Sequence, residues 1–124
     1  MNKVILTGNL CRDISIAETP SGKEVVQNCL AVRREYKNAN GEYDSDFINI
    51  VAWGAQAKYL NTYGKKGDRV EVVGRWEVGK YTDSDGTQRV TNKCVVENIS
   101  VFSSKPKEEQ QTTLQEYTDG DLPF

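Results

Sequence analysis

DFINIVAWGAQAKYLNTYG, residues 46–64, changes its hydrophobic period at Gly54. Before this glycine the residues alternate as in a β-strand, which gives two faces: Ile48, Ile50 and Ala52 on one, and Phe47, Asn49, Val51 and Trp53 on the other. After it, apolar residues recur at roughly helical spacing, at Ala55, Tyr59, Leu60 and Tyr63, and Gly64 is expected as the C-terminal cap. The stretch therefore predicts a strand followed at once by one short helix.

Four further strands are expected around this stretch. Two precede it and two follow it, at residues 2–10, 25–36, 68–81 and 89–102. Turn signals separate them: Pro20 and Gly22, then Asn40-Gly41 in the expected loop 37–46, and finally an exposed loop at 82–88. Five strands with one short helix between the third and fourth are the order of an OB-fold, an all-β Greek-key barrel. Val90, Cys94 and Val96 are expected to share one side of the last strand.

The composition argues against enzyme chemistry. The chain of 124 residues suits one domain, and it holds no histidine, which removes the commonest general base. The three cysteines are widely spaced without a CxxC pair, so we expect reduced core residues, no metal site and no cofactor. The first residues fit neither a signal peptide nor a membrane span, which predicts a cytoplasmic protein.

The charge is divided unevenly along the chain. Residues 1–102 carry 14 basic and 13 acidic side chains, whereas residues 103–124 carry 2 basic and 5 acidic ones. The second part is polar and poor in β-branched aliphatic residues, so it cannot bury enough apolar area to offset its ordering entropy. We expect a barrel domain over 1–102, a flexible linker over 103–118 and a separate acidic and apolar tip over 119–124.

Aromatic and basic side chains alternate where the barrel faces solvent. Phe47 and Trp53 share one side of the third strand, and the remaining candidates flank the neighbouring strands: Tyr36 and Tyr81, with Arg33, Arg34, Lys37 and Lys80. Rings stack unpaired bases regardless of their identity while cations contact phosphates, which predicts binding of single-stranded nucleic acid. The alternative is a structural role for these residues. The third strand would then be buried on both faces, the rings of Tyr36 and Tyr81 would be half-buried, and Lys66 would only solvate a turn beside Gly67.

Taken together, these segments resemble the bacterial and phage single-stranded DNA-binding proteins. The resemblance rests on the opening NKVILTGNL, GAQAKYL after the strand, KKGDRVEVVG, the hairpin KYTDSDGTQR and the acidic tip ending in Pro-Phe. It implies that Tyr36, Phe47, Trp53 and Tyr81 stack bases and that Lys66 and Lys80 are basic contacts. Arg75 is the last of the residues predicted to bind nucleic acid. The resemblance also implies a homotetramer with DNA wrapped around it.

Several positions depart from the family's pattern. Tyr36, Phe47 and Tyr81 stand where members often have tryptophan, and Ile48 stands where some have an interface histidine. Glu77 and Gly79 replace arginines of other members. These departures predict less stacking area per base and a different set of phosphate contacts.

The last six residues, DGDLPF, combine carboxylates with an apolar end. The predicted partner-binding residues are Asp119, Asp121, Leu122, Pro123 and Phe124. Phe124 can fill a pocket while the acids steer toward a basic rim. The expected function is therefore to coat single-stranded DNA and to recruit replication, recombination and repair enzymes through this tip.

Two other functions fit parts of the sequence. An OB-fold protein for RNA or for replication restart would explain the aromatic platform but not the tip. A metal-dependent nuclease on the same barrel would use carboxylates such as Asp44 and Asp46, although two acids beside a turn are more often solvated loop charges.

Overall fold

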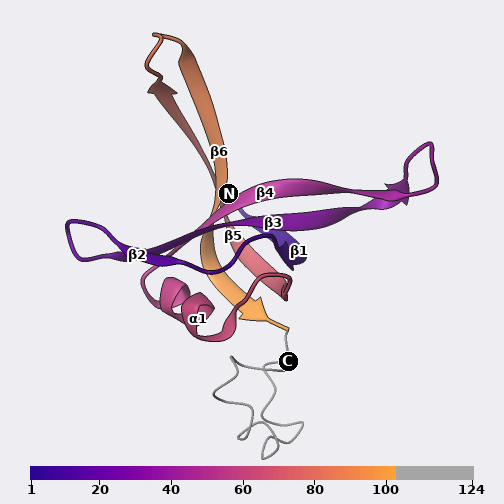
Figure 1. The fold of residues 1–124 in the computed structure, drawn as a ribbon, viewed down its shortest axis with the longest axis horizontal. Coiled ribbons are helices and arrows are strands. Elements are labelled where there is room, and N and C mark those ends of the chain that lie inside the picture. Colours follow the sequence, from indigo (N-terminus) through magenta and orange to yellow (C-terminus); the bar gives the residue numbers. More distant parts are fainter. Residues whose placement is uncertain (103–124) are drawn as a thin grey trace, which may run out of the picture.

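The computed structural model describes residues 1–102 of the chain, and the linker 103–118 and the tip 119–124 lie outside the described residues. Its elements follow the predicted order (Figure 1): β1 Val4–Leu10, β2 Ile16–Glu18, β3 Glu24–Lys37, β4 Tyr43–Trp53, α1 Ala55–Tyr63, β5 Arg69–Thr82 and β6 Gln88–Val101. The sequence missed β2, and it assigned residues 43–46 to a loop although they begin β4. Over the described range, no helix is long and apolar enough to cross a membrane.

Five of the strands close into a barrel. The sheet runs β1-β5-β6-β4-β3-β2, and β1 also pairs with β3, which joins the two sides of the barrel. The pairs are antiparallel except for β4 and β6, which run parallel at Ile50↔Cys94 and Val51↔Val95. This closed barrel with one helix between β4 and β5 confirms the predicted OB-fold, and β2 adds a short strand beside β3.

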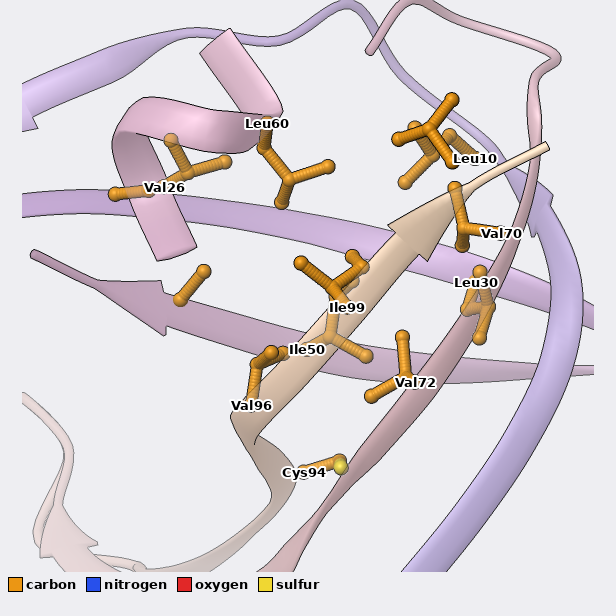
Figure 2. Packing of buried hydrophobic residues seen from close by; sticks show 13 residues of the cluster. Leu10, Val26, Leu30, Ile50, Leu60, Val70, Val72, Cys94, Val96 and Ile99 are labelled. Atoms are coloured by element: carbon orange, nitrogen blue, oxygen red, sulfur yellow. The ribbon is translucent and has the colours of Figure 1, made fainter. Parts of the chain in front are cut away.

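The core fills the barrel interior, and α1 covers one end of it. Figure 2 shows Leu60 of α1 pointing toward the same interior as Ile50, Val72 and Cys94 from three different strands. Ala57 and Leu60 are the buried helix residues, whereas Ala55 and Tyr63 of the predicted helical face are not buried. The helix buries a narrow face because one turn of apolar side chains is enough to close the small barrel.

Gly64 ends α1 for a different reason from the one predicted. Its φ of -90° and ψ of 151° are extended backbone rather than a left-handed cap, and its N–H donates to the Leu60 carbonyl at 2.8 Å. A Cβ at this position would lie 2.9 Å from the same carbonyl oxygen. Glycine is therefore required here by the close approach of the chain to the last helical turn.

A bulge in β6 changes which residues face the core. Val73 pairs with Asn98 while the next residue, Gly74, pairs with Val96, so Glu97 is the additional residue in β6. An extra residue shifts the alternation by one. The buried residues of β6 accordingly change parity: Cys94 and Val96 before the bulge, Ile99 and Val101 after it. Val90, predicted on the side of Cys94 and Val96, is exposed on the part of β6 toward the β5–β6 turn.

Two long hairpins extend beyond the barrel, as Figure 1 shows. One is β3–β4, which turns at residues 38–42, and the other is β5–β6, which turns at residues 83–87. The strands of each hairpin stay paired close to the turn, at Lys37↔Tyr43 and Thr82↔Gln88. Each strand therefore packs the core along one part and presents side chains to solvent along another.

Gly74→Ala is expected to destabilise the fold at the bulge. A Cβ at Gly74 would contact the backbone carbonyl of Val95 and would lie 2.8 Å from Cys94 Sγ, neither of which can move freely. Overpacking of this kind costs about 1–3 kcal/mol. Thermal unfolding measures the change, and Gly79→Ala is the matched control, because the Thr91 side chain, 2.7 Å from the new Cβ, can rotate away. Equal unfolding temperatures for the two variants would contradict this account.

Candidate nucleic-acid interface

The outward face of the β3–β4 hairpin carries the predicted aromatic platform. Phe47 and Trp53 point to the side opposite the core residue Ile50, with 70% and 41% of their surfaces exposed. The register places them opposite small or apolar residues of β3, at Ala31↔Phe47 and Val25↔Trp53. Because small neighbours leave the rings uncovered, each ring offers a face on which a base could stack.

Val51 does not belong to the exposed platform, although it shares the parity of Phe47 and Trp53. It is only 4% exposed because it lies between two strands, paired with Gln27 of β3 and Val95 of β6. The prediction of a continuous exposed face was therefore wrong at this position. The two aromatics are separated by a buried valine where the hairpins meet.

The parallel pair Val51↔Val95 continues the same face onto the β5–β6 hairpin. Counting by twos along β6 from Val95 reaches Arg89, which pairs with Tyr81 of β5. The register therefore places the exposed ring of Tyr81 on the side of the sheet that carries Trp53, although the two residues are far apart in sequence. Arg75, which pairs with Val95, lies on this side as well.

Tyr43 is a further aromatic on this face that the sequence reasoning did not include. The Arg33 guanidinium carbon lies 4.5 Å from the centre of the Tyr43 ring, and Lys37 Nζ lies 5.8 Å from it. Both are cation–π distances. The alternation that runs backward from Trp53 reaches residue 43 and could have revealed it, but the loop predicted around the Asn-Gly turn made the strand begin too late.

Arg34 and Tyr36 are placed differently from Arg33. Val32 pairs with Asp46, so Arg34, two residues further along β3, lies on the opposite side of the hairpin from Phe47. Arg34 binds Asp46 there, with Nη2 2.8 Å and Nε 3.1 Å from Oδ1. This hydrogen bonding lowers the pKa of Asp46 and raises that of Arg34, so the pair stays ionised at neutral pH. Tyr36 is exposed where the β3–β4 register shifts, and its charge interaction with Arg34 also raises the pKa of Arg34.

The three remaining predicted cations lie in different surroundings. Arg75 Nη2 is 2.8 Å from Glu77 Oε2, and hydrogen bonds from Arg75 and then Lys93 lower the pKa of Glu77. Lys80 pairs with Val90, on the side of the hairpin opposite Tyr81. Lys66 lies in the turn before β5, at the other end of that strand from Tyr81. The structure thus brings Arg33, Lys37 and Arg75 to the aromatic face, but not Arg34 or Lys80.

Two hollows mark the face. One of about 340 Å³ lies where the two hairpins meet and is lined mainly by polar side chains: Arg12, Gln27, Asn28, Asn49, Ile50, Val51, Thr91, Asn92 and Lys93. The other, of about 680 Å³, lies beside Trp53 and is lined by Gly22, Lys23, Glu24, Trp53, Gly54, Ala55 and Lys58. Lys23 and Lys93 are cations that sequence reasoning missed, because the contact of β4 with β6 and the β2–β3 turn become visible only in three dimensions.

The carboxylates considered for a nuclease each have a structural role. Asp44 Oδ1 accepts a hydrogen bond of 3.1 Å from Asn38 Nδ2, which steadies the β3–β4 turn. Asp46 binds Arg34. Within residues 1–102, no group of three or more metal-ligating acids or cysteines is brought together.

Comparison with known proteins identifies the family of this chain. Residues 1–102 match the Single-strand binding protein family. The chain is 37% identical over 112 residues to a single-stranded DNA-binding protein of Streptococcus mutans, covering 90% of this chain and 68% of that protein. It is 36% identical over 113 residues to single-stranded DNA-binding protein 1 of Lactococcus lactis, covering 91% and 75%. A third relative, single-stranded DNA-binding protein 3 of Streptococcus agalactiae, is 31% identical over 137 residues, covering 100% and 99%. Because the family model matches the whole of the barrel domain, this chain belongs to the single-strand binding protein family.

Proposed function

We propose that this protein binds single-stranded DNA without strong sequence preference, by stacking bases on exposed rings and holding phosphates with nearby cations. The observation that carries the proposal is the register that places Phe47, Trp53 and Tyr81 on one outward face across two hairpins. The names of the relatives support DNA as the ligand, and proteins of this family are non-enzymatic.

Stacking suits a ligand of any sequence. Each base has an aromatic face, and stacking on a protein ring contributes about 1–3 kcal/mol per base. Duplex DNA keeps its bases stacked on each other, so it cannot offer them to Phe47 or Trp53 without being opened. The exposed rings therefore favour single strands over duplexes of the same length.

Cations beside the rings would hold the phosphates. Arg33 and Lys37 are the best placed, because both lie over the Tyr43 ring and no acidic residue within the described chain forms an ion pair with them. Arg75 and Lys93 would first have to leave Glu77. Arg34, Tyr36, Lys66 and Lys80 remain proposed contacts for DNA that continues around the edges of the hairpins.

The proposal extends to assembly and partners. We propose a homotetramer around which DNA wraps, working in the cytoplasm in replication, recombination and repair. The tip 119–124 recruits enzymes of these pathways, with Phe124 in a pocket and Asp119 and Asp121 steering toward basic residues. Several copies of the tip on one oligomer would raise its effective concentration.

Trp53→Ala is expected to weaken binding of labelled oligo(dT) by about 5- to 150-fold, the equivalent of one lost stacking contact. Fluorescence anisotropy measures the affinity. Tyr63→Ala is the matched control, since Tyr63 is also an exposed aromatic, at 40% against 41% for Trp53, but belongs to α1. Equal losses in both variants, or wild-type binding to a duplex as tight as to oligo(dT), would contradict the stacking face.

Arg33→Gln and Arg34→Gln form a second matched pair. Neighbouring arginines of β3 point to opposite sides, and Arg34 is held by Asp46. Each phosphate contact on a single strand contributes about 0.7 to the slope of log K against log salt concentration. We expect Arg33→Gln to reduce the slope by about this amount and Arg34→Gln to reduce it by less, because Arg34 already holds Asp46 and exchanges one ionic contact for another. A larger reduction of the slope in Arg34→Gln than in Arg33→Gln would instead place the DNA on the other side of the hairpin.

Deleting residues 119–124 is expected to abolish the capture of replication and repair enzymes in pull-down experiments. The affinity for oligo(dT) should stay equal or rise slightly, because the acidic tip competes with DNA for basic residues. Anisotropy and pull-down on the same preparation separate the two effects. If the deletion removed DNA binding, the proposed division between barrel and tip would be wrong.

A further inference from the structure

Two cysteines lie side by side where the barrel closes. The ladder between β1 and β3 contains the pairs Asn9↔Ala31 and Leu10↔Leu30. The next position brings Cys11 beside Cys29, and Cys11 N–H donates to the Cys29 carbonyl at 2.9 Å. Paired residues of antiparallel strands have Cα atoms about 4.5–5.5 Å apart, within the range of about 4.4–6.8 Å that a disulfide bond spans.

Both cysteines are free and partly exposed, which corrects the expectation that all three cysteines are core residues. Cys94 alone is fully buried. Cys11 follows the last residue of β1, and Cys29 is on the outward side of β3, where alternation places it opposite the core residue Leu30. Burial, followed by the interaction with the neighbouring Cys29 side chain, raises the pKa of Cys11 to about 11.

We propose that Cys11 and Cys29 form a reversible disulfide bond that fastens β1 to β3 when a low-molecular-weight disulfide oxidises them. This modification does not depend on the DNA-binding proposal. The short ladder between β1 and β3, with two residue pairs, is the seam that closes the barrel, so a covalent bond at its end would hold the closed form. Disulfides in reducing compartments are usually transient or redox-sensing, which suits a reversible bond.

The chemistry is a balanced thiol–disulfide exchange. The thiolate of one cysteine attacks the small disulfide, forms a mixed disulfide and releases one small thiolate. The second cysteine then loses its proton, and its thiolate displaces the other small thiolate and closes the Cys11–Cys29 bond. The two cysteines lose two electrons, the small disulfide gains them, and the two protons end on the released thiols. The second step is intramolecular, which offsets the small thiolate fraction of Cys11 at neutral pH.

Oxidation is expected to raise the unfolding temperature by roughly 10 °C. A bond between Cys11 and Cys29 removes chain entropy from the unfolded state by closing a loop, an effect that has this order of magnitude for a loop of similar length. The native seam needs little rearrangement, since the two residues are already paired in register.

The test equilibrates the full-length protein in buffers of increasing glutathione disulfide, blocks remaining thiols with a maleimide, and maps the peptides by mass spectrometry. We expect an internal Cys11–Cys29 link, two hydrogen atoms lighter than the reduced pair, with Cys94 blocked only after unfolding. Calorimetry of the oxidised and reduced samples measures the stabilisation, and added dithiothreitol should reverse it.

Three variants separate the proposed bond from general oxidation. Cys11→Ser and Cys29→Ser should each lose the internal link and the rise in unfolding temperature, whereas Cys94→Ala should keep both. If Cys94→Ala does not fold, the peptide map of the wild-type chain decides alone. Mixed disulfides without the internal link, links between different molecules, or a link that leaves the unfolding temperature unchanged would each overturn the proposal.

Discussion

The parallel contact between β4 and β6 is the constraint on which both the core and the interface depend. It consists of two residue pairs, and each pair serves a different side of the sheet. Ile50 and Cys94 point inward and join the core. Val51 and Val95 lie on the other side, where they connect the outward faces of the two hairpins. A change in this register by one residue would exchange the two sides and would place polar groups in the core.

The same strands must satisfy two requirements along their length. Within the barrel, burial of Ile50, Val72 and Leu30 supplies the hydrophobic stabilisation. Beyond it, Phe47 and Tyr81 remain exposed, which gains no such free energy in the unbound protein. Their rings are supported by hairpins that stay paired close to their turns rather than by a loop, so they are presented on ordered backbone. Ordered rings lose less conformational entropy when a base stacks on them.

Alternation and the change of period at Gly54 were sufficient to predict the barrel and most of its core. They also identified Phe47 and Trp53, because a face opposite Ile50 has to point outward. What they could not predict depends on neighbours distant in sequence. The extra residue Glu97 reverses the parity of β6, and β6 covers Val51. The pairing of Arg34 with Asp46 follows from the β3–β4 register, whereas composition alone made Arg33 and Arg34 equivalent.

Some arginines and lysines of this protein already hold a carboxylate, and others do not. This difference decides how much ionic contacts and base stacking would each contribute to the proposed DNA complex. Residues 1–102 are nearly neutral, and several cations near the aromatic face already hold carboxylates, as Arg75 holds Glu77 and Arg89 holds Asp83. A cation that exchanges a carboxylate for a phosphate gains little net Coulomb energy, because one ionic contact replaces another. In the proposed complex, counterion release would therefore add less to affinity than the number of basic residues suggests, and stacking on Phe47, Trp53 and Tyr81 would have to contribute more. In the proposed complex, the uncovered rings are for this reason the part of the surface on which affinity would depend most.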